Sequence, residues 1–213
     1  MERRRRHSGG RDSGGTPDTR LRPFIKEVFP NNEMIKALEA AAQKRQVMAV
    51  YRDETGDSWS GIPVLTGPAL AVLAREQDFS LDGYLAIGAG EISGVEQYDD
   101  NDFIRRVMKG EGIYQGVKPP AGVTACRDWK ELLEGIQKGY GGWCIAECAD
   151  GEGELCFYVG KVLTLEQNHL TLRPVGADGR WNSEAAVLPY EDLRTISFGG
   201  NYLRVYQKYT GGR

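Results

Sequence analysis

Two stretches of this chain present the same order of short motifs, and this apparent repetition constrains the fold more than any other feature. The first stretch runs Gly61-Ile-Pro-Val-Leu-Thr, Leu70-Ala-Val-Leu, Leu81-Asp-Gly-Tyr, Glu91-Ile-Ser-Gly-Val95 and Phe103-Ile-Arg-Arg-Val107. The second runs Gly160-Lys-Val-Leu-Thr, Leu170-Thr-Leu, Ala177-Asp-Gly-Arg, Asp192-Leu-Arg-Thr-Ile196 and Tyr202-Leu-Arg-Val-Tyr206. An internal match of this kind predicts two similar units, and it exposes motifs that occur in one unit alone.

The composition is that of an ordinary soluble protein. The 213 residues are 40% hydrophobic and 27% charged, which suits one or two compact domains. No apolar run approaches the roughly 20 residues that a membrane helix requires. The basic segment Met1–His7 is not followed by an apolar stretch, so it does not resemble a secretory signal. We therefore expect a cytoplasmic protein with no membrane association.

Charge is distributed unevenly along the chain. Residues 1–22 carry a net charge of +4 and the whole chain −3, so the remainder carries −7. An acidic body repels phosphate backbones, and any contact with nucleic acid would come mainly from the arginines of the tail. The candidate phosphate contacts are Arg3, Arg4, Arg5 and Arg6. Residues 1–22 also contain almost nothing apolar, which predicts a disordered basic arm.

The pattern beyond this arm predicts one helix followed by about five short strands, twice over. A helix is expected from Asn31 to about Arg45, and a second after the capping residue Asp128. Phe103–Met108 and Tyr202–Tyr209 are expected to be the last strands of their units. Domain boundaries follow: residues 23–109 form the first unit, 110–126 a Gly/Pro linker, and 127–213 the second unit. The expected fold class is mainly β, with two tandem small barrels, each preceded by a short α-helix.

This order of elements resembles the Sm-like (SH3-like) small β-barrel fold. The detailed pattern is similar to a family of uncharacterised bacterial tandem-barrel proteins over nearly all of residues 31–209. Leu81-Asp-Gly-Tyr-Leu, Glu91-Ile…Val95 and Pro189-Tyr-Glu-Asp-Leu-Arg-Thr-Ile-Ser-Phe-Gly carry the likeness. No activity is assigned to that family, so the resemblance implies a fold rather than a function.

The Sm-like resemblance raises the question of RNA binding. RNA-binding members carry Asp and Asn in one loop and Arg-Gly before the fifth strand. Here Glu166 falls near the acidic position, and Asn168 or His169 near the Asn, but Phe198-Gly199 replaces Arg-Gly. The corresponding positions of the first unit lack the polar pair, and its later loop is the acidic run 99–102. The acidic body argues against this mode, and simple turn residues explain these positions better.

The other motifs have structural explanations that involve neither catalysis nor ligand binding. The glycine-rich stretch 88–94 has no counterpart in the second unit and no helix to meet a phosphate. Asp12-Ser13-Gly14 resembles a protease nucleophile segment, but it lies in the arm, with only His7 and His169 available as bases. The four cysteines suit buried thiols better than a zinc site, because Cys144 and Cys148 lack a second closely spaced pair. We expect no metal, no cofactor and no catalysis.

The strongest binding hypothesis concerns the last expected strand. If residues 202–209 are extended, Tyr202, Arg204, Tyr206 and Lys208 share one face and form an aromatic-basic ladder. We therefore expect a non-catalytic binding or adaptor protein whose partner is another protein, with edge-strand pairing and oligomerisation open to it. Sm-like binding of RNA, with stacking on Tyr202 and Tyr206, is the alternative.

Overall fold

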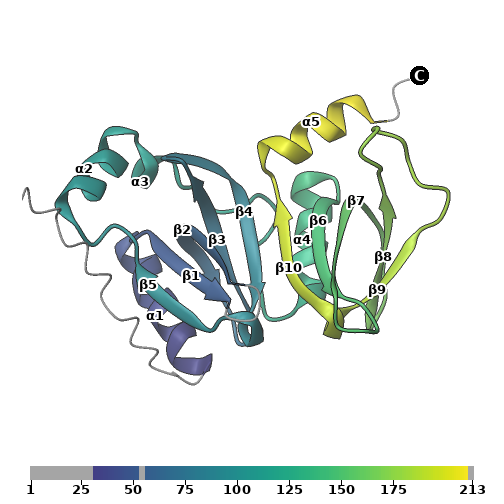
Figure 1. Cartoon of the computed structure of the whole chain (residues 1–213), viewed down its shortest axis with the longest axis horizontal. Coiled ribbons are helices and arrows are strands. Elements are labelled where there is room, and N and C mark those ends of the chain that lie inside the picture. Colours follow the sequence, from purple (N-terminus) through teal and green to yellow (C-terminus); the bar gives the residue numbers. More distant parts are fainter. Residues whose placement is uncertain (1–30, 53–55, 211–213) are drawn as a thin grey trace, which may run out of the picture.

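The computed structural model of the chain describes residues 31–52 and 56–210 (Figure 1). In chain order its elements are α1 (Asn31–Lys44), β1 (Met48–Arg52), β2 (Asp57–Thr66), β3 (Leu70–Gln77), β4 (Ser80–Gly88), η1 (Ala89–Glu91), β5 (Gly94–Gln97), α2 (Asp102–Gly110), α3 (Ile113–Gly116), α4 (Trp129–Tyr140), β6 (Trp143–Ala149), β7 (Leu155–Leu165), β8 (His169–Pro174), β9 (Ala186–Pro189), η2 (Tyr190–Asp192), β10 (Leu193–Phe198) and α5 (Asn201–Tyr209). Within the described ranges, no helix is long and apolar enough to cross a membrane.

All ten strands belong to one open antiparallel sheet, in the order β5-β1-β2-β3-β4-β10-β6-β7-β8-β9. The expected mainly β class with two closed tandem barrels is therefore wrong, and the fold is mixed α/β with 30% helix. The sheet stays open because of the strand with which β4 pairs. Instead of helping to close the first five strands on themselves, β4 pairs antiparallel with β10, as in Ile196 opposite Ala86. Strand count alone did not determine the partners of the edge strands.

Both halves of the sheet have the same strand order. In each half the fifth strand along the chain lies first, followed by the first four in sequence. A short 3-10 turn, η1 or η2, separates the fourth and fifth strands in each case. This is a correspondence in topology, and it does not show the tandem repeat that the motifs suggested.

Two segments expected to be strands are helices. Residues 103–108 lie in α2, where the Asn101 side chain accepts a hydrogen bond from the Ile104 N–H and caps the first turn. Residues 202–209 lie in α5, which follows β10 directly. Figure 1 shows α2 and α3 over the first half and α5 over the second, at the same end of the molecule. These segments are too short for their apolar pattern to distinguish helix from strand.

Local sequence explains the helices that were expected. In α4, Asp128 accepts a hydrogen bond from the Glu131 N–H, and Gly141 ends the helix in the left-handed conformation with φ 62°. In α1, the helical spacing of Met34, Leu38 and Ala41 places all three in the core. These predictions are confirmed, because α1 spans Asn31–Lys44 and α4 begins directly after Asp128.

Helices α1 and α4 cover different faces of the sheet. Alternate residues of β3 contribute to two clusters: Ala71 and Leu73 pack with α1, whereas Leu70 and Val72 belong to the cluster around α4. Strand β3 is thus buried on both faces, as its unbroken apolar run suggests. The core around α4 therefore draws on residues from both halves of the sheet.

The sheet is strongly coiled. Strands β1 and β6 are separated by five steps in the strand order, which in a flat sheet amounts to about 24 Å. Yet the Arg52 side chain of β1 reaches Glu147 of β6 at 2.6 Å. Close crossing of strands assists this curvature at Gly61 of β2, where a Cβ atom would lie 2.5 Å from the Ala74 carbonyl oxygen. Coiling therefore brings distant strands into direct contact.

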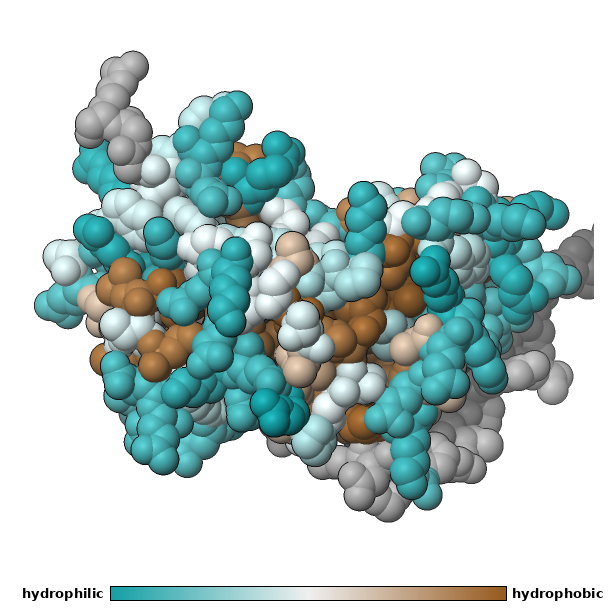
Figure 2. All heavy atoms as spheres, turned by 180° about the vertical axis from the view of Figure 1, so that it is seen from behind, coloured by the Kyte–Doolittle hydropathy of each residue, from teal (hydrophilic) through white to brown (hydrophobic). Residues whose placement is uncertain are grey.

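The face of the molecule opposite to the view of Figure 1 is mostly hydrophilic. Seen from behind, teal polar side chains dominate, and apolar brown areas show over the C-terminal half and near the middle of the molecule (Figure 2). In the C-terminal half, exposed apolar side chains include Phe157 and Leu163 of β7 and Val187 of β9.

Candidate functional site

A basic cleft lies between the end of α1, strand β5 and helices α2 and α3. The pocket has a volume of about 550 Å³ and is wide open to solvent. Its lining combines four cations, two amides, one phenol and one carboxylate: Lys44, Arg45, Gln46, Gln97, Asp99, Arg105, Lys109 and Tyr114. Cationic side chains thus exceed carboxylates by three in this cleft, on a body whose residues 31–213 carry −7.

Backbone contacts hold the two arginines of the cleft. Arg105 donates hydrogen bonds of 3.1 Å to the carbonyl oxygens of Asp99 and Asp100, and it also pairs with Asp102. Arg45 directly follows α1 with φ 53° and donates a 3.1 Å hydrogen bond to the Tyr114 carbonyl oxygen. These bonds restrict the directions in which the two guanidinium groups point.

The two lysines are arranged differently. Lys44 is the last residue of α1, and Lys109 lies in the last turn of α2; both are exposed. Neither has a carboxylate within salt-bridge distance among residues 31–52 and 56–210. A cation at a helix C-terminus is favourable for that helix, so these lysines have a local reason to be there and remain available to an anion.

The floor of the cleft is a buried hydrogen-bond chain around Asp99. The Tyr114 hydroxyl donates to one carboxylate oxygen at 2.5 Å, and the Gln97 amide donates to the other at 3.0 Å. Gln46 in turn donates to Gln97 at 2.9 Å. Burial, and then the hydrogen bond to Asp99, raises the pKa of Tyr114 well above its usual range. Asp99, the carboxylate among the described residues that line the cleft, is therefore occupied by donors from the protein.

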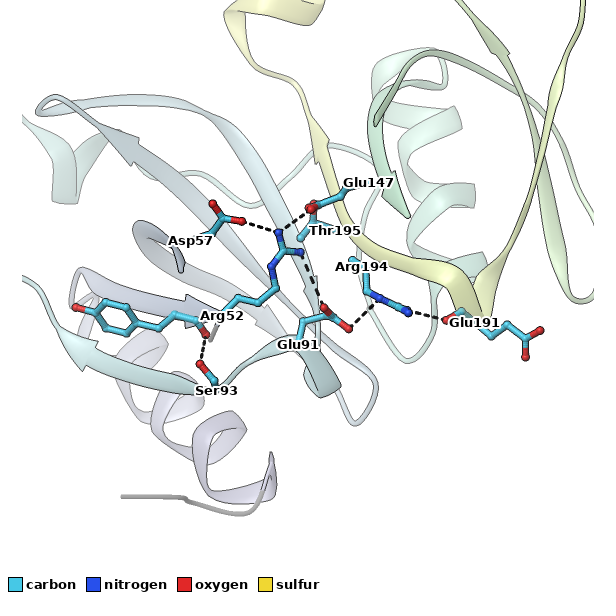
Figure 3. A network of polar contacts seen from close by, with 9 residues as sticks. Arg52, Asp57, Glu91, Ser93, Glu147, Glu191, Arg194 and Thr195 are labelled. Carbon is cyan, nitrogen blue, oxygen red and sulfur yellow. Dashed lines mark hydrogen bonds and ion pairs between the residues drawn. The ribbon is translucent and has the colours of Figure 1, made fainter. Parts of the chain in front are cut away.

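A second cluster of charges lies buried where the two halves of the sheet meet (Figure 3). The Arg52 guanidinium contacts Glu147 at 2.6 Å and Asp57 at 2.7 Å, with Glu91 at 3.9 Å. Arg52 and Glu147 side chains are both only 3% exposed. Burial alone would lower the pKa of Arg52, but the hydrogen bonds to Glu147 and Asp57 raise it on balance.

Further contacts extend this network across β10. Thr195 donates a 2.7 Å hydrogen bond to the second oxygen of Glu147. Glu91 also pairs with Arg194 at 3.3 Å, and Arg194 donates to the Glu191 carbonyl oxygen. Each residue labelled in Figure 3 contacts another residue of the protein. Its evident role is to hold the coiled sheet together, because it joins β1 to β6 and β10.

The aromatic-basic ladder does not exist as expected. In α5, Tyr202 and Tyr206 are one turn apart and their rings stack at 4.7 Å, whereas Arg204 and Lys208 project from the opposite side of the helix. Arg204 contacts Asn201, and the Lys208 ammonium lies 5.0 Å from the Tyr209 ring. The helix separates the two kinds of side chain that an extended strand would have aligned. The binding role of these residues is a prediction that stands untested.

The remaining candidates are spread over the molecule. Arg3, Arg4, Arg5 and Arg6 lie outside the described residues. Glu166, Asn168 and His169 lie at the β7–β8 turn, where the Glu166 N–H bonds the His169 carbonyl. Gly88 and Gly90 lie where β4 leads into η1, and they meet no long helix.

The thiols are mostly buried. Cys126, Cys144 and Cys148 are buried, and burial raises the pKa of Cys144 to about 12. Cys148 and Cys156 face each other across β6 and β7. No group of three or more metal-ligating side chains occurs within residues 31–52 and 56–210.

Sequence reasoning missed the basic cleft because it treated residues 103–108 as a strand. In a helix, Arg105 and Lys109 are one turn apart and face the same way. The signal was present: Asn101 is a good capping residue, and Gly110 marks a stop. Comparisons of the chain with protein-family models, with curated proteins and with solved structures find no match.

Proposed function

We propose that this chain is a non-catalytic binding protein whose ligand carries phosphate groups and binds in the basic cleft. One observation carries the proposal. Four cationic side chains surround an open pocket of about 550 Å³ on an otherwise acidic body. Pockets of about 300–1,000 Å³ are the size range of ligand sites.

The chemistry of the cleft favours phosphate over other anions. Arg45 and Arg105 are held by backbone oxygens, and their guanidinium groups suit the oxygens of a phosphate. Lys44 and Lys109 add mobile point charges from two different helices. The four cations around the opening repel one another. A ligand with more than one negative charge relieves more of this repulsion than a ligand with a single charge, so the cleft favours a multiply charged group.

Two sources can supply this chemistry, a single-stranded nucleic acid or a small phosphorylated molecule. The first retains the RNA-binding alternative, but moves the phosphate contacts from the tail to the cleft. We would measure binding of a fluorescein-labelled single-stranded RNA by anisotropy at low salt, and binding of inorganic pyrophosphate by calorimetry. RNA binding without pyrophosphate binding indicates a nucleic-acid ligand, and the reverse indicates a small molecule.

The variant that tests the site is Lys44→Glu/Lys109→Glu. It should weaken binding by about tenfold or more, because each reversed charge costs of the order of 1 kcal/mol or more next to phosphate. The matched control, Lys138→Glu/Lys161→Glu, changes the net charge equally but alters exposed lysines of the other half. Equal losses in both variants would contradict a localised site.

Absence of binding to both probes at low salt would overturn the proposal. So would binding of poly-glutamate with higher affinity than RNA and pyrophosphate, since that result would identify an acidic protein segment as the ligand. Tyr202→Ala/Tyr206→Ala should leave phosphate binding unchanged, because α5 belongs to the other half of the molecule (Figure 1).

A further inference from the structure

We propose that copies of this chain assemble head to tail, with strand β9 of one copy adding antiparallel to strand β5 of the next. These are the two outermost strands of the sheet. Among the residues described, β5 pairs with β1 alone and β9 with β8 alone. Strands at sheet edges present unpaired N–H and C=O groups that readily accept another strand. The pairing does not require a ligand in the basic cleft, although Gln97 of β5 lines that cleft as well.

The hydrogen bonds of β5 define which of its groups face outward. The Tyr98 N–H donates to the Val47 carbonyl, in line with the register that places Glu96 opposite Ala49. In an antiparallel pair, alternate residues bond to the neighbour and the residues between them face away. The backbone groups of Val95 and Gln97 therefore point away from β1.

The same reasoning applies to β9. The Tyr190 N–H donates to the Asn168 carbonyl, in line with the register that places Leu188 opposite Leu170. Alternation then turns the backbone groups of Val187 and Pro189 away from β8. Proline lacks an N–H, so Pro189 loses no bond to β8 but donates none to an added strand, and the added ladder depends on Val187.

The pairing of β4 with β10 inside one chain predicts the register for the pairing of β9 with β5 between two chains. Inside the chain β4, the fourth strand of its half, pairs with β10, the fifth strand of the other half, with Ala86 opposite Ile196. Ala86 lies two residues before Gly88, the N-cap of η1, and Ile196 three residues after Leu193, the C-cap of η2.

Counting the same distances from the corresponding caps identifies the equivalent residues at the free edges. Val187 lies two residues before Pro189, the N-cap of η2, and Val95 three residues after Ile92, the C-cap of η1. The internal register therefore places Val187 of one copy opposite Val95 of the next. The backbone groups of both residues face outward. The strand topology and the alternation of hydrogen bonds therefore indicate the same register.

The side chains at this register are also compatible. Val187 is 59% exposed, so an added strand could cover its side chain. Opposed valines on paired strands stabilise one another through cross-strand contact. The two edges differ, so the contact is head to tail and leaves one free edge of each kind at the ends of a dimer. Larger assemblies follow as the concentration rises.

Two proline variants of the full chain test the model without disturbing its internal ladder. Val95→Pro removes an outward N–H from β5, and Val187→Pro removes one from β9. Mass should be measured by light scattering over a concentration series. We expect wild type to exceed the 23.6 kDa of one chain, and each proline variant to remain at that mass. Val95→Thr and Val187→Thr keep the N–H and should assemble like wild type.

Mixing the two proline variants is the decisive measurement. Val95→Pro retains a competent β9 edge and Val187→Pro a competent β5 edge, so the mixture should form a heterodimer of about 47 kDa, twice the mass of one chain. Circular dichroism and urea unfolding would verify that both variants fold.

Three results would overturn the proposal. The first is a wild type that stays monomeric at every concentration. This result counts against the proposal even if a variant that lacks residues 1–30 assembles. The second is a Val95→Pro or Val187→Pro variant that assembles like wild type, since pairing of like edges would explain it. The third is a mixture of folded variants that stays monomeric. RNA or pyrophosphate binding by an obligate monomer would leave the proposed function standing while the assembly model fails.

Discussion

The charges at the centre of the sheet and those of the basic cleft are of the same types but are arranged in opposite ways. Arg52 is 3% exposed and in contact with carboxylates, among them Glu147 at 2.6 Å. Lys44 and Lys109 are exposed and, in the part of the chain that the structure describes, no carboxylate lies within pairing distance. The first group binds within the protein, and the second is available to a ligand.

This difference teaches where a charge contributes to the fold and where it contributes to binding. A buried ion pair costs several kcal/mol of desolvation, and it persists only with close geometry and further hydrogen bonds. The network around Arg52 has both, through Thr195 and Asp57. Exposed cations have little desolvation cost and little internal stabilisation. The contrast leads to four predictions, which test whether burial alone separates the two groups.

Removal of Glu147 should have the largest effect. Glu147→Ala leaves the buried Arg52 guanidinium without its closest partner and the Thr195 hydroxyl without its acceptor. We expect the free energy of unfolding to fall by about 3–5 kcal/mol. Urea denaturation followed by circular dichroism would measure it.

The matched control is Glu152→Ala in the exposed β6–β7 turn, which should change stability by no more than about 0.5 kcal/mol. The double variant Arg52→Met/Glu147→Met should lose less than the sum of the single variants, because it removes both charges together. Equal effects of Glu147→Ala and Glu152→Ala would show that the network does not hold the sheet.

Asp99 allows the same comparison within the cleft, because it is a buried carboxylate beside exposed cations. Asp99→Ala removes the acceptor of hydrogen bonds from Tyr114 and Gln97. A hydrogen bond to a charged group contributes about 1.5–3 kcal/mol, so a loss of about 2 kcal/mol is expected in urea denaturation. Asp100→Ala, an exposed neighbour, is the control. If Asp99→Ala lowers the free energy of unfolding no more than Asp100→Ala does, burial does not decide which charges stabilise the fold.

Much of the local structure followed from the sequence. Helix α1 and helix α4 with its Asp128 cap lie close to where the sequence placed them, and five strands follow each of them, as expected. Burial dictates these elements, because a strand such as β3 must hide an apolar run. Pairing between β4 and β10 did not follow, since the free energy of joining two edges depends on the shapes of both halves rather than on either strand alone.

The candidate site was much less accessible to sequence reasoning. Residues 202–209 alternate in a way that suits either a strand face or two sides of a helix, and α5 adopts the second. The cleft joins residues from α1, β5, α2 and α3, far apart along the chain. Such a site exists only once tertiary contacts, such as the Arg45 bond to the Tyr114 carbonyl, bring these elements together.

The buried hydrogen bond of Tyr114 should make the stability of the fold depend on pH. Burial and the bond to Asp99 raise the pKa of Tyr114 in the folded state above its unfolded value of about 10. A raised pKa means that the protonated phenol stabilises the fold fully below about pH 10, and that this contribution is lost as the pH rises through the folded value. Tyr114→Phe should cost about 1 kcal/mol at pH 7.

The difference between wild type and Tyr114→Phe should then shrink as the pH is raised above about 10. Urea unfolding at several pH values would measure this trend. Tyr209→Phe is the control, because Tyr209 is 67% exposed and lies in α5. A difference between wild type and Tyr114→Phe that grows above pH 10 would contradict the assignment of Tyr114 as the hydrogen-bond donor.

The smallest effect, and the one of opposite sign, is expected for the cleft lysines. Lys44→Gln/Lys109→Gln should change the free energy of unfolding by no more than about 0.5 kcal/mol. At low salt the change should be a gain, because it relieves repulsion among four cations. Raising the ionic strength to about 0.15 M, where the screening length is about 8 Å, should diminish this gain. The effect of Glu147→Ala should stay nearly constant over the same range, because buried charges are screened much less. A salt-independent loss above 1 kcal/mol would mean that these lysines stabilise the fold, and the distinction between the two groups of charges would no longer hold.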